Sequence, residues 1–194
     1  MQSATLARAG GRPRRAGISA AVLMATADLV SQQGVPRTTL DDIASRAGVA
    51  KTTLYRRWPS KGALAVDALA HVLGEVPVVA VPTDAGLREA VAWLVSRMRQ
   101  AAVADLLSGV VAEAAHDPEL RRLLRERIRD PFTTRLSTDW DLAPADVDRA
   151  FDIVVGSLVH RHAMNGEITD IDIEVVTSVA TLLLFGRSPV AQDL

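Results

Sequence analysis

A short segment of the chain gathers side chains that could bind a polyanion. Between Lys51 and Arg57 the sequence reads KTTLYRR, which supplies cations, hydroxyls and one phenol. On a helix Leu54 and Trp58 share one face, because they lie four positions apart, and we expect that face to be buried. The remaining surface carries Lys51, Thr52, Thr53, Tyr55, Arg56 and Arg57. Arginine can bind guanine through two hydrogen bonds, and threonine and tyrosine can contact a thymine methyl or a phosphate, so this surface suits a DNA groove.

The residues before this segment predict a short helix with a defined start. Thr38 and Thr39 offer N-caps, and Asp41 and Asp42 follow three residues later, in a pattern close to the capping box. The apolar stripe of this helix consists of Leu40, Ile43, Ala44 and Ala47. The amides at a helix N-terminus can bind a phosphate, so we expect Thr39 to contact DNA.

A tight turn joins this helix to the next one. Gly48 lies at the turn, which needs a residue that tolerates positive φ. A third helix is expected from about Ala50 to Trp58, where Pro59 stops it. Ser60 caps a fourth helix from Lys61 to about Leu73, and the Lys61 ammonium is expected to contact a phosphate. Two short helices joined in this way form a helix-turn-helix unit.

Charge is distributed unevenly along the 194 residues. The net charge is −1, but residues 1–61 hold ten basic and three acidic residues, which makes this part +7 and the remainder −8. A basic end on an acidic body favours a polyanionic partner at one end only. Residues 1–17 are expected to form a flexible basic arm whose Arg12, Arg14 and Arg15 enter a minor groove. The alternative is a disordered tail that only increases solubility.

Residues 18–64 resemble the N-terminal DNA-binding domain of the TetR family of bacterial transcriptional regulators. The resemblance is carried by a first helix, from about Ile18 to Gln33, that ends in QQG, and by TTLDDIASRAGVAKTTLYRRWPSKGAL. By this resemblance, DNA contacts are expected at Thr39, Lys51, Thr52, Thr53, Tyr55 and Lys61. Leu54 and Trp58 match core positions, where Trp58 replaces a more usual phenylalanine.

The resemblance also implies the organisation of the whole protein. It implies about nine helices, a homodimer, and an operator with partial two-fold symmetry. Residues 65–194 would then form the effector-binding and dimerisation domain, paired through the helices at 144–164 and 172–185. Repression relieved by a small molecule is the usual outcome in the family, and activation is the alternative.

The remainder of the sequence predicts further helices. Residues 75–84 contain Pro77 and Pro82 and are expected to form a linker. Helices are then expected at roughly 85–100, 101–115, 118–136, 144–164 and 172–185. The apolar stripe of the helix at 144–164 consists of Val147, Phe151, Val154, Val155, Leu158 and His162. The stripe of the helix at 172–185 consists of Ile173, Val176, Ala180, Leu183 and Leu184. Few aromatic residues and many Ala, Leu and Arg favour an all-α fold.

A ligand pocket in this body is expected to be mostly apolar. Its candidate lining residues are Trp93, Met98, Leu106, Val110, Glu113, His116, Phe132, Trp140, Phe151 and Met164. Glu113, His116 and Arg161 would be its polar anchors, and the ligand would be a small hydrophobic or amphipathic molecule. The apolar candidates have an alternative role as ordinary core. A basic run, Arg121, Arg122, Arg125, Arg127 and Arg129, predicts a solvated face, with an anion-binding surface as the alternative.

Catalytic and metal sites are not predicted. The chain has no cysteine, which excludes disulfides, thiolate metal sites and cysteine nucleophiles. His160 and His162 lie two apart and point away from each other on a helix. Glu113 and His116 have the Glu-x-x-His spacing of di-iron bundles but no second copy. No G-x-S-x-G elbow or phosphate-binding glycine loop occurs, so we expect no enzyme and no cofactor.

Two other function classes stay open at this point. One is a ligand- or partner-gated helical interaction protein without operator specificity, and the other is an enzyme built on a helical bundle. No apolar run approaches the ~18 residues of a membrane span. A secretion signal ending near Ala27 is disfavoured, because the helical spacing of Ile18, Val22, Ala25 and Leu29 continues past it, and a cytoplasmic protein is expected.

Overall fold

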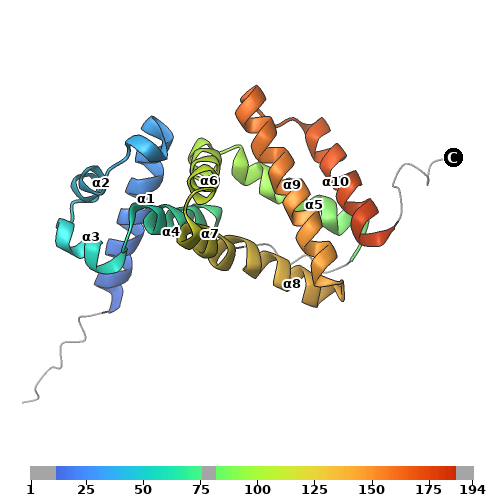
Figure 1. The fold of residues 1–194 in the computed structure, drawn as a ribbon, viewed down its shortest axis with the longest axis horizontal. Coiled ribbons are helices and arrows are strands. Elements are labelled where there is room, and N and C mark those ends of the chain that lie inside the picture. Colours follow the sequence, from blue (N-terminus) through green and yellow to red (C-terminus); the bar gives the residue numbers. More distant parts are fainter. Residues whose placement is uncertain (1–11, 76–81, 187–194) are drawn as a thin grey trace, which may run out of the picture.

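The computed structural model describes residues 12–75 and 82–186, with side chains from Ser19 onward, and all regular structure in this part is helical (Figure 1). The elements are α1 (Arg12–Arg37), α2 (Leu40–Ala47), α3 (Lys51–Arg57), α4 (Lys61–Leu73), α5 (Asp84–Met98), α6 (Ala101–Ala114), α7 (Pro118–Leu124), the π-turn η1 (Arg125–Arg129), α8 (Asp130–Trp140), α9 (Pro144–Asn165) and α10 (Asp170–Phe185). The predicted all-α fold is confirmed. Figure 1 shows α1–α4 at one end, α9 and α10 at the other, and α6 and α7 between them.

The first helix starts earlier than predicted. The sequence predicts a start at Ile18, but α1 begins at Arg12, so Arg12, Arg14 and Arg15 lie in its first turns and not in an extended arm. Pro13 is compatible with the first turn of α1, because amides of the first helical turn have no partner within the helix. Near its other end α1 breaks at Gly34, whose φ of 78° is left-handed. Residues 1–11 of the predicted arm lie outside the described part of the chain.

Helices α1 to α4 enclose a small core of their own. Its buried members are Val22, Leu29, Ile43, Ala44, Leu54, Trp58 and Leu64. The predicted bounds of α2 and α4 are confirmed, and α3 is shorter than predicted by one residue at each end. This core fixes α3 on α1 and leaves its opposite side open to solvent.

Two helices of this unit also belong to the larger core of the body. On α4, Leu64 packs in the small core, whereas Leu69 packs in the large one. Helix α6 packs on both α1 and α4. At Gly109 of α6 the contact is so close that a β-carbon would lie 2.4 Å from Val35 Cγ2. The helix-turn-helix unit and the body are therefore joined through shared packing.

The predicted helix at 118–136 is three elements. Asp117 caps α7, with Pro118 at its first position, as proline before a helix predicts. The π-turn η1 follows, in which the Asp130 amide donates to the Arg125 carbonyl, five residues back. Pro131 explains the break, because proline donates no amide and its ring would clash with a carbonyl of a regular helix. Helix α8 then continues to Trp140, beyond the predicted end.

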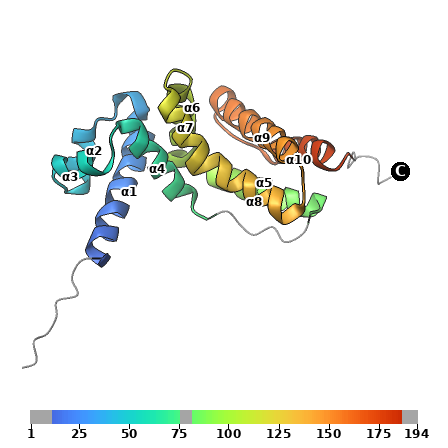
Figure 2. The same cartoon turned by 60° about the horizontal axis from the view of Figure 1, so that its bottom comes forward.

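Helices α9 and α10 form an antiparallel pair on one side of the body (Figure 2). The inner stripe is largely as predicted, with Val147, Val154 and Leu158 buried on α9, but Leu183 of α10 is exposed. The Arg161 guanidinium ties the pair by donating to Asp172 Oδ1 over 2.8 Å. No helix in the described ranges is long and apolar enough to cross a membrane. Of the predicted linker, residues 76–81 fall outside those ranges.

Candidate nucleic-acid interface

Short-range hydrogen bonds hold the turn that presents α3. The Asp42 amide donates to Thr39 Oγ1 over 3.1 Å, and the Thr39 amide donates back to Asp42 Oδ2 over 3.2 Å, which completes the predicted capping box. At the other end of α2, Gly48 has the predicted positive φ, 65°, and its amide donates to carbonyls of the last turn. The angle between α2 and α3 thus follows from contacts within a few residues of the turn.

The underside of α3 is anchored by a leucine and a tryptophan. Leu54 is 1% exposed and Trp58 is 6% exposed, as the sequence predicts. The Trp58 indole Nε1 also donates to Asp67 Oδ2 of α4 over 2.9 Å. This polar contact was not predicted, because it joins residues whose side chains meet only after α3 and α4 have packed.

The outer surface of α3 carries the predicted polar set. Thr52, Tyr55, Arg56 and Arg57 are exposed, and Thr53 is half-buried. Lys51 is exposed as well, and its ammonium lies 2.6 Å from Asp41 Oδ2. That hydrogen bond to the carboxylate raises the pKa of Lys51. The Arg57 guanidinium lies 5.6 Å from the Trp58 ring centroid. The surface therefore offers hydroxyls, a phenol and cations in one place, with Thr39 exposed at the start of α2.

Lys61 has partners within the protein that the sequence did not predict, and its phosphate contact stays a prediction. Its ammonium is half-buried and donates to the carbonyls of Val35 and Pro36 over 2.7 and 3.3 Å. It also lies 3.8 Å from Glu113 Oε1 of α6. Lys61 thus neutralises the carbonyl end of α1, a role that sequence spacing alone does not reveal. The side chains of Arg12, Arg14 and Arg15 lie outside the described part of the chain, so their groove contacts stay a prediction.

Known bacterial regulators are similar in sequence to this chain. A family model described as "Bacterial regulatory proteins, tetR family" matches residues 22–68. The DNA-binding transcriptional repressor TetR of Mycobacteroides abscessus is 31% identical over 164 residues, which cover 78% of this chain and 85% of that protein. The chain belongs to the TetR family. The predicted family is therefore confirmed, whereas the individual DNA contacts stay predictions.

Two other known proteins are similar to this chain, one in sequence and one in fold. An HTH-type transcriptional regulator of Mycobacterium tuberculosis is 37% identical over 116 residues, which is 59% of this chain but only 58% of that relative's length. A solved structure of the regulator FadR from Bacillus subtilis, in complex with stearoyl-CoA, superposes with a TM-score of 0.61 at 18% identity. That superposition covers 86% of this chain and 98% of FadR, so the two share a fold.

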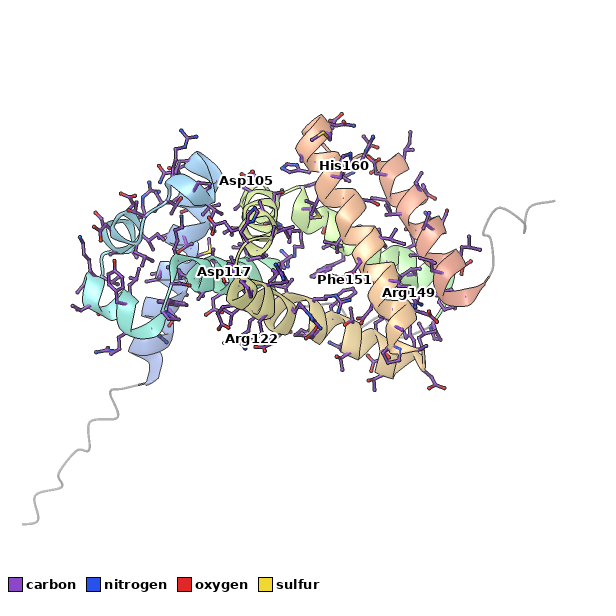
Figure 3. The ribbon with its side chains drawn as sticks, in the orientation of Figure 1. Asp105, Asp117, Arg122, Arg149, Phe151 and His160 are labelled. Atoms are coloured by element: carbon purple, nitrogen blue, oxygen red, sulfur yellow. The ribbon has the colours of Figure 1, made fainter. Side chains whose placement is uncertain are left out.

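The body of this TetR-family chain contains a cleft between α4, α5, α6, η1, α8 and α9. It holds about 500 Å³ of accessible space, within the usual range for small-molecule sites. Three predicted pocket residues line it, namely Trp93, Phe132 and Phe151. The rings of Phe132 and Phe151 lie 5.4 Å apart, and Figure 3 places Phe151 on the part of α9 that faces the centre of the body.

The other predicted pocket residues do not line this cleft. Leu106, Val110 and Met98 are buried, and Trp140 is buried against Phe185. Met98 borders a separate groove beside the start of α10. Glu113 lies beside Lys61, and His116 and Met164 are exposed. Their role in ligand binding stays a prediction, since an apolar side chain on an amphipathic helix fills the core unless a gap between helices happens to reach it.

The cleft contains charged residues that were not among the predicted pocket residues, although Arg127 belongs to the basic run for which an anion-binding surface is the alternative. Arg127 of η1 and Arg135 of α8 both line it, together with Glu75 at the end of α4. Two other arginines of the predicted solvated run are paired with acidic side chains, and Arg121 donates to the carbonyls of Ala114 and Ala115. Arg122 binds Glu119 and Glu126, and Arg129 lies between acidic residues of α8 and α9. Pro131 was a usable signal in the sequence for these side chains. A proline inside a predicted helix indicates a break, and a π-turn rotates the neighbouring side chains relative to a regular helix.

Histidine and acidic side chains do not gather into a metal site. Within the described ranges no group of three or more such residues could hold a metal ion. His162 lies 4.0 Å from Asp105, and Figure 3 labels His160 and Asp105 on separate helices.

Proposed function

We propose that the chain is a transcriptional regulator that reads operator DNA as a homodimer in the cytoplasm. A small molecule bound in the helical body releases it from the DNA, which makes it most simply a repressor. It acts by binding and not by catalysis. The single observation that carries the proposal is the exposed polar face of α3 on a capped turn, in a chain that belongs to the TetR family.

The α3 surface divides by chemistry into base and phosphate contacts. Arg56 is the candidate for reading a base, because arginine can match guanine with two hydrogen bonds. Lys51, Tyr55 and the N-terminus of α2 at Thr39 are candidates for binding phosphates, which set register but carry no sequence information. The +7 charge of residues 1–61 supports binding through the α1–α4 end.

A second copy of the chain is proposed to pack on α9 and α10. The outer face of α10 exposes Ile171, Val175, Val179, Leu182 and Leu183, and the neighbouring face of α9 exposes Ile153 and Met164. Exposed apolar residues gathered on two adjacent helices mark an interaction surface. Two-fold packing there would present two copies of α3 to half-sites about 34–36 Å apart.

Release is proposed to follow from a ligand in the cleft of the body. The FadR neighbour is in complex with stearoyl-CoA, which supports a ligand-binding role for a body of this fold. A ligand that prefers the conformation with the wrong spacing for DNA shifts the population toward it. A preference of ~100-fold corresponds to about 2.7 kcal/mol of coupling.

The deciding experiment is binding of the purified chain to the DNA upstream of its own gene, with scrambled DNA of equal length as control. We would measure both at about 50 and 200 mM salt, because phosphate contacts weaken steeply over this range. A specific preference that persists at the higher salt, with protected segments one helical turn apart, supports the proposal. Weak binding that disappears equally for both DNAs would contradict it and favour an interaction protein without operator specificity.

A further inference from the structure

The cleft in the body joins apolar walls to two cationic side chains. Its walls include Leu94, Leu107 and Val155, and its charged lining consists of Arg127, Arg135 and Glu75. Each arginine also has a carboxylate partner, since Arg127 lies 3.2 Å from Asp67 Oδ1 and Arg135 lies 3.3 Å from Asp139 Oδ2. A mostly apolar site with a cationic edge complements a molecule that has an apolar chain and one anionic group.

The apolar side of the cleft continues into the core. Leu94, Phe132, Phe151 and Val155 line both the cleft and a smaller, partly open hollow, whose lining residues are all apolar. The tilted ring pair of Phe132 and Phe151 forms part of the shared wall. A ligand chain in the cleft would therefore meet apolar surface along these walls.

Arg127 connects the cleft to the helix that carries the DNA-reading surface. Its guanidinium lies 3.2 Å from Asp67 Oδ1 of α4. The other oxygen of Asp67 accepts the hydrogen bond from the Trp58 indole beneath α3. The Arg127 side chain is 56% exposed, so water and a second anion can reach it. An anion that binds Arg127 competes with Asp67 for the same cation.

We propose that the effector is an amphipathic anion whose head binds Arg127 and Arg135 and whose chain lies against Phe132 and Phe151. By pairing with Arg127, the head weakens the contact of Arg127 with Asp67 and so loosens the support of Trp58 under α3. This inference rests on the proposed function, since it names the effector class of the same cleft and the contact through which the effector acts.

The first test compares probes that share one chain length and differ in the head. Decanoate, decyl phosphate, decanol and decylamine would be titrated into the full-length protein below their micelle concentrations, by calorimetry and by tryptophan fluorescence, to which Trp93 in the cleft contributes. The two anions are expected to bind about tenfold tighter or more than decanol and decylamine. The better of the two anions distinguishes a carboxylate from a phosphate head. Equal binding of decanol and both anions would overturn the proposal.

Arginine variants assign the head group to its site. Arg127→Gln and Arg135→Gln are each expected to weaken binding of decanoate by about tenfold and to leave decanol binding unchanged. Arg125→Gln is the matched control, because Arg125 is exposed on the same π-turn and does not line the cleft. If Arg125→Gln weakened decanoate binding as much as the other two, the effect would be one of general charge and the assignment would be wrong.

Asp67→Asn separates the ligand site from the DNA response. Without its rival carboxylate, Arg127 should bind decanoate more tightly, while ligand-free protein should bind operator DNA more weakly. These opposite shifts are not expected of a variant that merely folds poorly. Weaker binding of both decanoate and DNA would overturn the proposed competition. If the anions bind as expected but no DNA is bound specifically, the proposed function fails and the ligand class stands.

Discussion

At the scale of single residues, the role of each cation near α3 depends on its partners inside the protein. Arg56 is exposed, and no acidic side chain lies within ion-pair distance of it in the described structure. Lys51 reaches an acidic side chain across the turn, and Lys61 binds main-chain carbonyls. Similar residue types in one short segment are therefore suited to different tasks.

Arg56→Ala is expected to relax sequence preference. Loss of a base contact should cost about 1–3 kcal/mol on the preferred operator and much less on scrambled DNA. Competition binding with the two DNAs measures the difference. Arg149→Ala removes the same charge from an exposed position on α9, far from α3 in Figure 3, and should change neither affinity. An equal loss on both DNAs would assign Arg56 to a phosphate.

Lys61→Ala is expected to lower stability, because the carbonyls of Val35 and Pro36 lose their donor. Hydrogen bonds from a charged group suggest a cost of about 1–3 kcal/mol, seen in urea unfolding. The sequence had predicted a phosphate contact, with a fall of ~1 in the salt dependence of DNA binding. Lys51→Ala is the matched control, since these are the only two lysines of the chain. A fall in the salt dependence for Lys61→Ala, with unchanged stability, would support the phosphate contact that the sequence predicts.

At the scale of helices, close packing and ion pairs connect helices that lie far apart in the sequence and are predicted separately from it. Helix α6 meets α1 at Gly109 and Val35, where there is no room for a β-carbon. Helices α9 and α10 are tied at the beginning of α10, where Asp172 is 8% exposed. The same carboxylate accepts from the Thr169 amide and from Arg161. These contacts set helix spacing in the body and its attachment to α1.

Gly109→Ala is expected to destabilise the protein, even though alanine is the better helix former. The new methyl would have to displace Val35, and overpacking of this kind costs about 1–3 kcal/mol. Thermal unfolding followed by circular dichroism at 222 nm measures the effect. Unchanged or raised stability would show that α6 moves away from α1 without cost, and would remove the argument for tight coupling between the two units.

Asp172 is expected to make stability depend on acid. Hydrogen bonds from the Thr169 amide and hydroxyl, together with the charge of Arg161, lower the pKa of Asp172 in the folded state. Its stabilising effect is therefore complete above the ordinary pKa of about 4 in the unfolded chain, and is lost as pH falls through the lower folded value. The difference in unfolding temperature between wild type and Asp172→Asn should be largest near pH 7 and shrink below pH 4. A difference that is constant with pH would assign the effect to packing alone.

At the scale of the whole molecule, the outer face of α9 and α10 is the surface that we propose packs against a second copy. Val175 is 56% exposed at the centre of the α10 stripe. Burial of these apolar side chains against a second copy would lower the free energy of the pair. Such a contact would place two α3 surfaces on one DNA duplex.

Val175→Glu is expected to produce a folded monomer, because a buried carboxylate on the two-fold face would repel its counterpart. Sedimentation velocity would report the change in mass. Operator affinity should fall by about 10²-fold or more, since the second half-site no longer binds as part of the same particle. Val111→Glu, at an exposed apolar position on α6, should leave the dimer intact. A dimer that survives Val175→Glu unchanged would move the interface elsewhere.

The sequence by itself determined the helix-turn-helix unit. Thr39, Asp42, Gly48 and Ser60 act through hydrogen bonds and backbone preferences within one turn of the chain, so their effects can be predicted without knowing what packs against them. The buried positions of Leu54 and Trp58 also follow from helical spacing. The start of α1 was wrong because residues before Ile18 are polar and carry no apolar stripe, although their backbone is helical.

Tertiary structure alone decided which side chains meet across helices. The carbonyl partners of Lys61 could not be predicted, because they lie 25 and 26 residues earlier in the chain. The cleft depends on gaps between six elements. Arg127 lines it from the π-turn η1, and its partner Asp67 lies 60 residues away in the sequence. Helical periodicity shows which face of a helix is apolar, but not which neighbour covers that face. The distances between packed helices, which local sequence does not encode, determined the cleft in the body and the contacts of Asp67 with both Arg127 and Trp58.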